Sequence, residues 1–281
     1  MSYSVFLAVL FSAALHAGWN ALVKIKLDPF LAMTLICCAC GAIALPIVAF
    51  IGPPRPAAWP WIFASIAVHL GYYLFLAQAY RLADMMQVYP IARGAAPLMT
   101  AAASLVAVRD PISVGALFGI ALLAAGVLLV ALGGHRRFAP PSRLAIISAL
   151  LTAATVSAYT IIDGVGARAA GDPNAYAASL FALDAYPMLL ICLWRHGLAG
   201  TKAMFNFLTP GLAGGAMSLA AYWIVIWAMT QAPIALVAAT RESSVLFGGL
   251  IAVFILKEPT TPIRIVAAAL ILAGLALMRL F

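Results

Sequence analysis

Charged residues are scarce in this sequence. Only 9% of its 281 residues are charged, while 66% are hydrophobic. Soluble domains carry about 25% charged and about 45–50% apolar residues. No soluble core could bury this apolar excess, which excludes an ordinary soluble domain. We therefore expect lipid to be the solvent for most of the surface, and the chain to be an integral membrane protein.

Motifs for metal binding and catalysis are also lacking. Three of the four cysteines, Cys37, Cys38 and Cys40, lie in one apolar run without histidine or acidic neighbours. Metal clusters need such partners, so these residues fit small apolar packing positions better. The chain has no HExxH motif, no acidic cluster and no nucleophile elbow. The sequence predicts no metal, no cofactor and no catalytic residue, which leaves a membrane-embedded enzyme as a disfavoured alternative.

Long apolar runs dominate what is present. A spanning helix needs about 20 mostly apolar residues, and proline, glycine and charge divide the chain into ten such runs. The connections between them are too short for a soluble domain. No repeated charge ring or filter points to a channel. The sequence predicts an all-α fold with ten transmembrane helices, at about 3–23, 29–51, 60–81, 85–107, 112–133, 143–164, 173–194, 211–231, 234–256 and 260–280.

An internal repeat relates the two halves. The segment RDPISVGALFGIALLAAGVLLVAL, from Arg109, aligns without a gap to KEPTTPIRIVAAALILAGLALMRL, from Lys257. This alignment places Gly126 opposite Gly274. It also pairs two acid-proline turns, in which Asp110 and Glu258 are expected to cap the helices that follow them. A direct role of these acids in transport is the alternative.

A second match supports the repeat and sets its geometry. SAALHAGWN in the first span matches TAATVSAYT in the sixth, which pairs Trp19 with Tyr159. Each half has five spans, an odd number, so the second half must enter the membrane from the opposite side. The sequence thus predicts two inverted five-helix repeats around a central cavity. We place the first at 1–135 and the second at 143–281, joined by a linker loop at 136–142.

Basic residues outnumber acidic ones, 16 to 8, and they lie mostly between the apolar runs. This placement is typical of membrane topology signals and argues against nucleic-acid binding. One side of the membrane would hold ten of them: Lys24, Lys26, Arg81, Arg136, Arg137, Arg143, Arg195, Lys202, Lys257 and Arg264. The other side would hold Arg55, Arg109, Arg168 and Arg279. The positive-inside rule then puts both termini outside.

Two arginines lie inside spans. The gapless alignment carries Arg93 in the fourth span onto Arg241 in the ninth, each about 12 Å into its helix at 1.5 Å per residue. A charge at this depth costs about 2.5–3.5 kcal/mol, so it should face a partner or a polar cavity. Glu242 supplies the opposite charge and should reach another helix, because adjacent residues do not share a helix face. Alternatively, the arginines could bond backbone carbonyls freed near Pro90 and Pro97.

Further polar and aromatic side chains could join that cavity. They share a position well inside a span, away from the interface where aromatic residues usually anchor. Histidine at such a depth could instead hold helices together. Asp163, one turn beyond Tyr159, and Asp184 are also deep, and the role of Asp184 stays open between pairing and gating. The candidate substrate-binding residues are His16, Trp19, Asn20, His69, Tyr73, Tyr89, Arg93, Tyr159, Tyr222, Arg241 and Glu242.

With these motifs, the chain resembles EamA-type members of the drug/metabolite transporter superfamily. The resemblance rests on the two sets of five spans and on the doubled pattern from Arg93 to Gly126 and from Arg241 to Gly274. It implies a cavity lined by spans one, three, four, six, eight and nine, with five and ten packed together outside it. It also implies a multi-pass carrier of the bacterial inner membrane with its termini usually inside, contrary to the charge count.

The resemblance implies export of small metabolites, and amino acids, including aromatic ones, are a frequent substrate class. Aromatic lining together with both signs of charge suits a zwitterion, with an arginine on its carboxylate and Glu242 on an ammonium or a coupling proton. We expect alternating access by a monomer. A multidrug or lipid-linked-sugar carrier is the alternative. Small relatives carry an essential acid in the first span, where this chain has Trp19 and Asn20, so their proton-exchange mechanism is not expected to transfer.

Overall fold

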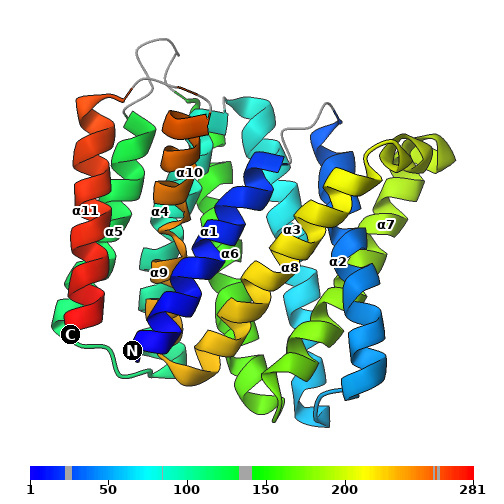
Figure 1. The fold of residues 1–281 in the computed structure, drawn as a ribbon, viewed down its shortest axis with the longest axis horizontal. Coiled ribbons are helices and arrows are strands. Elements are labelled where there is room, and N and C mark those ends of the chain that lie inside the picture. The colour runs from blue at the N-terminus through cyan, green and yellow to red at the C-terminus, as the bar shows by residue number, and fades with distance from the viewer. Residues whose placement is uncertain (23–26, 84, 133–140, 256, 258–259) are drawn as a thin grey trace.

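The structure is a computed structural model that describes residues 1–22, 27–83, 85–132, 141–255, 257 and 260–281. The described chain is a bundle of helices with both termini at the same end (Figure 1). The first repeat contains α1 (Tyr3–Leu22), α2 (Pro29–Ile51), η1 (Pro56–Ala58), α3 (Trp59–Leu82), α4 (Met85–Ala103), η2 (Ser104–Val108) and α5 (Val114–Leu132). The second contains α6 (Arg143–Ala169), α7 (Pro173–Phe205), α8 (Leu208–Gln231), α9 (Ile234–Arg241), α10 (Ser244–Leu250), η3 (Ile251–Ile255) and α11 (Pro262–Leu280).

The helices cover the expected spans, but α6 and α7 continue past the predicted ends at 164 and 194, to Ala169 and Phe205. Among the described residues, nine helical segments are long and apolar enough to cross a membrane, and α5 contributes a shorter apolar stretch, Val114–Val130. The predicted ninth span is divided into α9, α10 and η3. The division falls at Glu242 and Ser243, whose amides bond the carbonyls of Ala239 and Thr240 three residues back. Such bonds tighten a turn without ending the span.

Several expected features lie outside the described residues. They are Glu258 and Pro259 of the second acid-proline turn, most of the 136–142 linker, and Lys24, Lys26, Arg136 and Arg137.

Aspartate-proline pairs begin two helices that the repeat relates. The Asp28 carboxylate accepts hydrogen bonds from the amides of Phe30 and Leu31 at the start of α2. The Asp172 carboxylate accepts one from the Asn174 amide at the start of α7. A side-chain oxygen at this position satisfies amides that the helix cannot, and proline suits the first helical residue.

The repeat is visible in the packing of the helices. Helix α1 packs on α8, and its counterpart α6 packs on α3, while the related pairs α2–α7 and α5–α11 meet each other. The turns after the fourth and ninth spans also match. Arg109 follows the π-helical turn η2 with φ 61°, and Lys257 lies two residues after the π-helical turn η3 with φ 58°. Left-handed backbone is uncommon for residues other than glycine, so its recurrence at aligned positions supports the alignment.

Glycines explain why α5 and α11 lie so close, at the left edge of Figure 1. A Cβ added at Gly119 would lie 2.8 Å from the Gly274 carbonyl oxygen, and one added at Gly274 would lie 2.6 Å from that of Gly119. A Cβ at Gly126 would lie 2.8 Å from the Ala267 carbonyl oxygen. Small residues allow helix backbones in a membrane to approach in this way. The repeat aligned Gly126 with Gly274. Both glycines lie in the contact between α5 and α11, outside the centre of the bundle.

One expectation about capping is wrong. Asp110 does not cap α5; the Ser113 hydroxyl oxygen accepts from the Ala116 amide there. Asp110 Oδ2 instead accepts from the Ile234 amide, 2.8 Å away, at the start of α9 in the other repeat. Three residues separate Asp110 from the start of α5 at Val114, too far for the short side chain to reach the α5 amides. In this structure Asp110 therefore joins the two repeats.

Candidate functional site

An ion pair between the repeats occupies the expected centre. Arg93 Nε on α4 lies 2.8 Å from Glu242 Oε2, at the end of α9. Arg241 Nη2 lies 3.8 Å from the other Glu242 oxygen. As expected, Glu242 reaches another helix more closely than it reaches its neighbour. All three residues are buried, with 5%, 2% and 4% of Arg93, Glu242 and Arg241 exposed.

The cluster of Arg93, Arg241 and Glu242, here called the charged centre, carries two positive charges and one negative charge. Its net charge is therefore +1 (2 − 1). The Arg241 guanidinium lies over the Tyr222 ring, 5.4 Å from its centroid. Its Nε has no hydrogen-bond partner among the described residues. Within the described chain, neither arginine bonds a backbone carbonyl near Pro90 or Pro97, so that alternative is not realised.

Side chains from α1 and α4 complete one flank of the charged centre. Arg93 Nη2 lies 3.4 Å from His16 Nε2, and His16 Nδ1 accepts a hydrogen bond from the Trp19 indole. The Tyr89 ring lies below the Arg93 guanidinium, 5.8 Å from it. Asn20 donates to the His16 backbone carbonyl of its own helix, so its amide supports α1 locally. The i, i+3 and i, i+4 spacing of these residues places them along one stripe of each helix.

The other flank is a group of aromatic rings around His69. The His69 ring stacks on Tyr159 of α6, with centroids 4.2 Å apart, and its Nδ1 contacts the Ser65 carbonyl. Tyr222 of α8 meets both Tyr159 and His69 edge to face. Tyr73 lies beside His69 on α3. The structure thus brings rings from α3, α6 and α8 together next to Arg241.

Two buried aspartates extend this group. The Asp163 carboxylate accepts hydrogen bonds from the Tyr222 hydroxyl at 2.6 Å and the Tyr176 hydroxyl at 3.0 Å. Asp184 Oδ2 accepts from the Tyr73 hydroxyl at 3.3 Å, and Asp184 Oδ1 has no partner among the described residues. Neither aspartate was among the candidate binding residues. Their depth in apolar runs was the available signal, because intramembrane carboxylates mark functional sites by default.

The two halves differ at the position of Glu242, and the packing explains the difference. Gly94 is the repeat counterpart of Glu242, and a Cβ added there would lie 2.5 Å from Leu128 Cγ of α5. In the first repeat a side chain at this position would have to displace Leu128. In the second repeat the tightened turn after α9 leaves the Glu242 carboxylate beside Arg93. A single acid thus serves both arginines.

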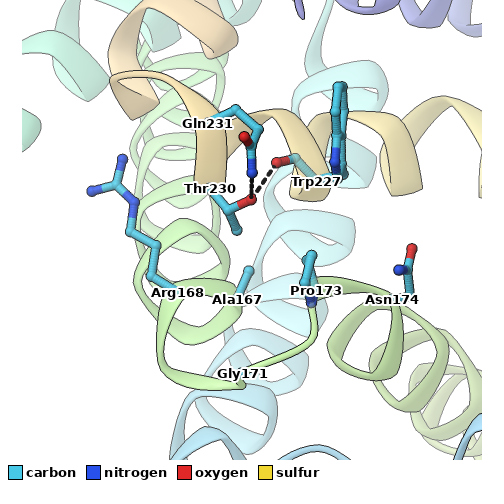
Figure 2. Close-up of a pocket in the computed structure, with 8 residues that line it drawn as sticks. All are labelled: Ala167, Arg168, Gly171, Pro173, Asn174, Trp227, Thr230 and Gln231. Atoms are coloured by element: carbon cyan, nitrogen blue, oxygen red, sulfur yellow. Dashed lines mark hydrogen bonds between the residues drawn. The ribbon is translucent and has the colours of Figure 1, made fainter.

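A polar pocket lies at the end of the bundle that carries the termini. It has a volume of about 550 Å³ and lies between the α6–α7 turn and the end of α8. Figure 2 shows Thr230, Gln231 and Trp227 above the pocket, facing Pro173 and Asn174 below it. The Asn174 side-chain oxygen also accepts a hydrogen bond from the Trp223 indole. The pocket could admit a polar small molecule from this side.

An ion pair beside this pocket fastens three helix ends and the turn before α5. Arg168, at the end of α6, forms a bidentate pair with Asp110, with bonds of 2.7 and 3.1 Å. Arg168 also donates to the carbonyls of Met229 and Ala232 at the end of α8. With the Ile234 amide on Asp110, this group, here called the clasp, joins α6, α8, α9 and the turn before α5. Burial alone would raise the pKa of Asp110, but the Arg168 and Ile234 hydrogen bonds outweigh it and lower that pKa.

Comparison with known proteins agrees with this architecture. The model of the EamA-like transporter family matches residues 3–132 and 143–280. Twenty-eight chains of solved structures are similar. One, titled only "Crystal structure of protein", is 19% identical with a TM-score of 0.80, and the match covers 100% of this chain and 99% of the other. At this identity the likeness shows the fold alone. A comparison with curated proteins finds no match.

Proposed function

Because the chain belongs to the EamA-like transporter family, and is thus a multi-pass membrane transporter, we propose that it carries zwitterionic metabolites. Amino acids, including aromatic ones, are the favoured class, and export by alternating access is the favoured direction. We place the protein in the bacterial inner membrane, working as a monomer. The proposal rests mainly on the net positive charge of the charged centre, which lies beside a group of aromatic rings.

The substrate carboxylate is assigned to Arg241. Neither arginine Nε forms a hydrogen bond within the described part of the chain, but Arg93 Nε lies 2.8 Å from a Glu242 oxygen, whereas the Arg241 contact with Glu242 is 3.8 Å long. A carboxylate there would neutralise the remaining positive charge, and charge-assisted hydrogen bonds are about twice as strong as neutral ones. Glu242 keeps the two arginines from repelling each other. A lipophilic cation has no carboxylate to pair with Arg241, so a multidrug carrier is less well supported.

Aromatic side chains and a buried aspartate could bind the other groups of the substrate. Tyr159, Tyr222 and His69 present ring faces and edges that would stack on an apolar or aromatic group. Asp184 Oδ1, an acceptor unpartnered among the described residues, is a candidate for the ammonium group. This assignment leaves Glu242 free to remain in its ion pair. His16, Trp19 and Tyr89 support Arg93 from the other flank.

Access would alternate between the two ends of the bundle. In this structure the clasp fastens the end that carries the termini, below the charged centre. The polar pocket beside it would be the vestibule on that side. Opening would require Arg168 to leave Asp110 and the carbonyls that end α8. The charge count would make this side the outside.

The test is counterflow of labelled amino acids in liposomes containing the purified full-length chain. We expect exchange of at least one aromatic amino acid, competition by other amino acids, and little competition by hydrophobic cations. Arg241→Gln should abolish exchange, while Lys202→Gln, which removes an exposed charge outside the bundle centre, should leave it intact. Unimpaired exchange in Arg241→Gln would refute the carboxylate assignment. Competition by hydrophobic cations alone would favour a multidrug carrier.

A further inference from the structure

A groove of about 310 Å³ lies between α3 and α7, outside the proposed transport site. Its walls combine apolar and basic side chains, namely Leu74, Phe75, Ala77, Gln78, Arg81 and Arg195. The α3 members recur at three- and four-residue intervals, so they form one stripe along the helix. Leu74 and both arginines are exposed, so this stripe faces outward from the bundle.

The height of the groove matches the boundary between lipid tails and headgroups. Arg81 comes 22 residues after the first residue of α3 (81 − 59), and Arg195 comes 22 residues after the first residue of α7 (195 − 173). At 1.5 Å per residue both lie about 33 Å along their helices. The hydrocarbon core is about 30 Å thick, which places both guanidinium groups at headgroup level. Leu74 lies about 10 Å deeper, among the tails.

The two arginines have no acidic partner in the described chain. None of its ion pairs includes Arg81 or Arg195. The Arg195 guanidinium lies over the Phe30 ring, 5.6 Å from its centroid, which holds it near the groove. The acid nearest to that ring in sequence, Asp28, is engaged in capping α2. Two positive charges above an apolar wall match an anionic headgroup above an acyl chain.

At this height α3 and α7 leave space that a ligand can fill. The groove also lies at the end remote from the termini, which the charge count makes cytoplasmic. Anionic lipids concentrate in that leaflet.

We propose that this groove is a binding site for one anionic glycerophospholipid. Arg81 and Arg195 hold the headgroup phosphate, Gln78 donates to it or to the ester oxygens, and Leu74, Phe75 and Ala77 contact an acyl chain. The site would fix the relative position of α3 and α7, and thus of Tyr73 and Asp184, which join the same two helices deeper in the bundle at 3.3 Å. The proposal does not depend on the identity of the transported substrate.

Native mass spectrometry of the purified full-length chain in detergent tests it directly. The protein is titrated with phosphatidylglycerol or with phosphatidylcholine that has the same acyl chains. We expect phosphatidylglycerol to bind at least about tenfold more tightly, and the Arg81→Gln/Arg195→Gln double variant to lose this preference. The matched control, Arg143→Gln/Lys202→Gln, removes two exposed basic charges elsewhere on the same side and should keep the preference within about twofold.

A second variant tests the apolar half of the groove. Ala77→Trp adds bulk against the acyl chain and removes no charge, so it should weaken binding of the lipid several-fold while glycerol phosphate remains a poor competitor. Equal affinity of the unmodified protein for the two lipids would overturn the proposal. So would an equal loss in the control pair, or competition by glycerol phosphate as strong as by the whole lipid, which would indicate a free-anion site. Slower transport by Ala77→Trp with unchanged lipid binding would make the groove a substrate portal instead.

Discussion

Arg93 and Glu242 form an ion pair across the two repeats, with Nε and Oε2 2.8 Å apart, in the interior of the membrane domain. Each charge alone would cost about 2.5–3.5 kcal/mol at this depth. The pair offsets much of that cost and fixes α4 against the turn after α9. Because Arg241 shares the same acid at 3.8 Å, one carboxylate orients both guanidinium groups.

Removal of this acid should destabilise the protein strongly. Glu242→Gln leaves two buried arginines without a counter-charge, and breaking a buried pair in this way costs about 3–5 kcal/mol. Thermal unfolding in detergent would measure the loss. The double variant Arg93→Gln/Glu242→Gln should recover part of it, since it removes a charge of each sign. A double variant less stable than either single one would contradict the pairing.

Arg241 should matter more for transport than for folding. Arg241→Lys keeps the charge but removes Nε and the planar donor pair, so we expect a rise of about tenfold or more in the apparent KM for an amino acid. The melting temperature should change little, because lysine keeps the positive charge and the contact of Arg241 with Glu242, at 3.8 Å, is longer than that of Arg93, at 2.8 Å. Liposome uptake at varied substrate concentration would show the change. An unchanged KM would remove Arg241 from the binding site.

The clasp should respond to acid. The pKa of Asp110 is lowered in the folded protein, so its contribution to stability is present above the unfolded value of about 3.9. That contribution is lost as pH falls through the lower folded pKa. Asp110→Asn should remove this part of the stability loss below about pH 4.

The stability of the wild-type protein and of Asp110→Asn, measured by unfolding at pH 7 and at pH 3, would show the difference. Asp172→Asn, which removes a capping carboxylate at the same end of the bundle, is the control. Identical acid sensitivity in wild-type protein and Asp110→Asn would contradict the role of the clasp.

Close packing of α5 and α11 predicts a sharp difference between glycines. Gly119→Ala would place a Cβ 2.8 Å from the Gly274 carbonyl oxygen, and overpacking of this kind costs about 1–3 kcal/mol. Gly248→Ala, in α10, meets nothing within 4 Å. It should be neutral or slightly stabilising, because alanine favours helix by about 1 kcal/mol over glycine. Melting temperatures of the two variants would show the contrast, and equal values would disprove the close contact.

Much of the charged centre could be predicted from the sequence because the repeat places an arginine at the same position in each half. The alignment of Arg93 with Arg241 indicated two charges near the midplane, and the depth of Glu242 indicated an acid between them. Tyr176 could not be found in this way, since a tyrosine early in a helix looks like an interface anchor. Its hydroxyl proved to hold Asp163 at 3.0 Å. The partner of Asp110 was equally hidden, because Arg168 lies 58 residues away.

The sequence by itself determined the class of protein, the number of spans and the inverted repeat, because these follow from apolar length, charge spacing and an odd number of crossings. Only the tertiary structure decided which charges meet. Side-chain partners depend on helix rotation and on tight turns such as the one at Glu242 and Ser243, and a shift of one residue turns a side chain by about 100° around its helix. For that reason the sequence predicted only that Glu242 reaches another helix, and the fold showed that Arg93 on α4 is its partner.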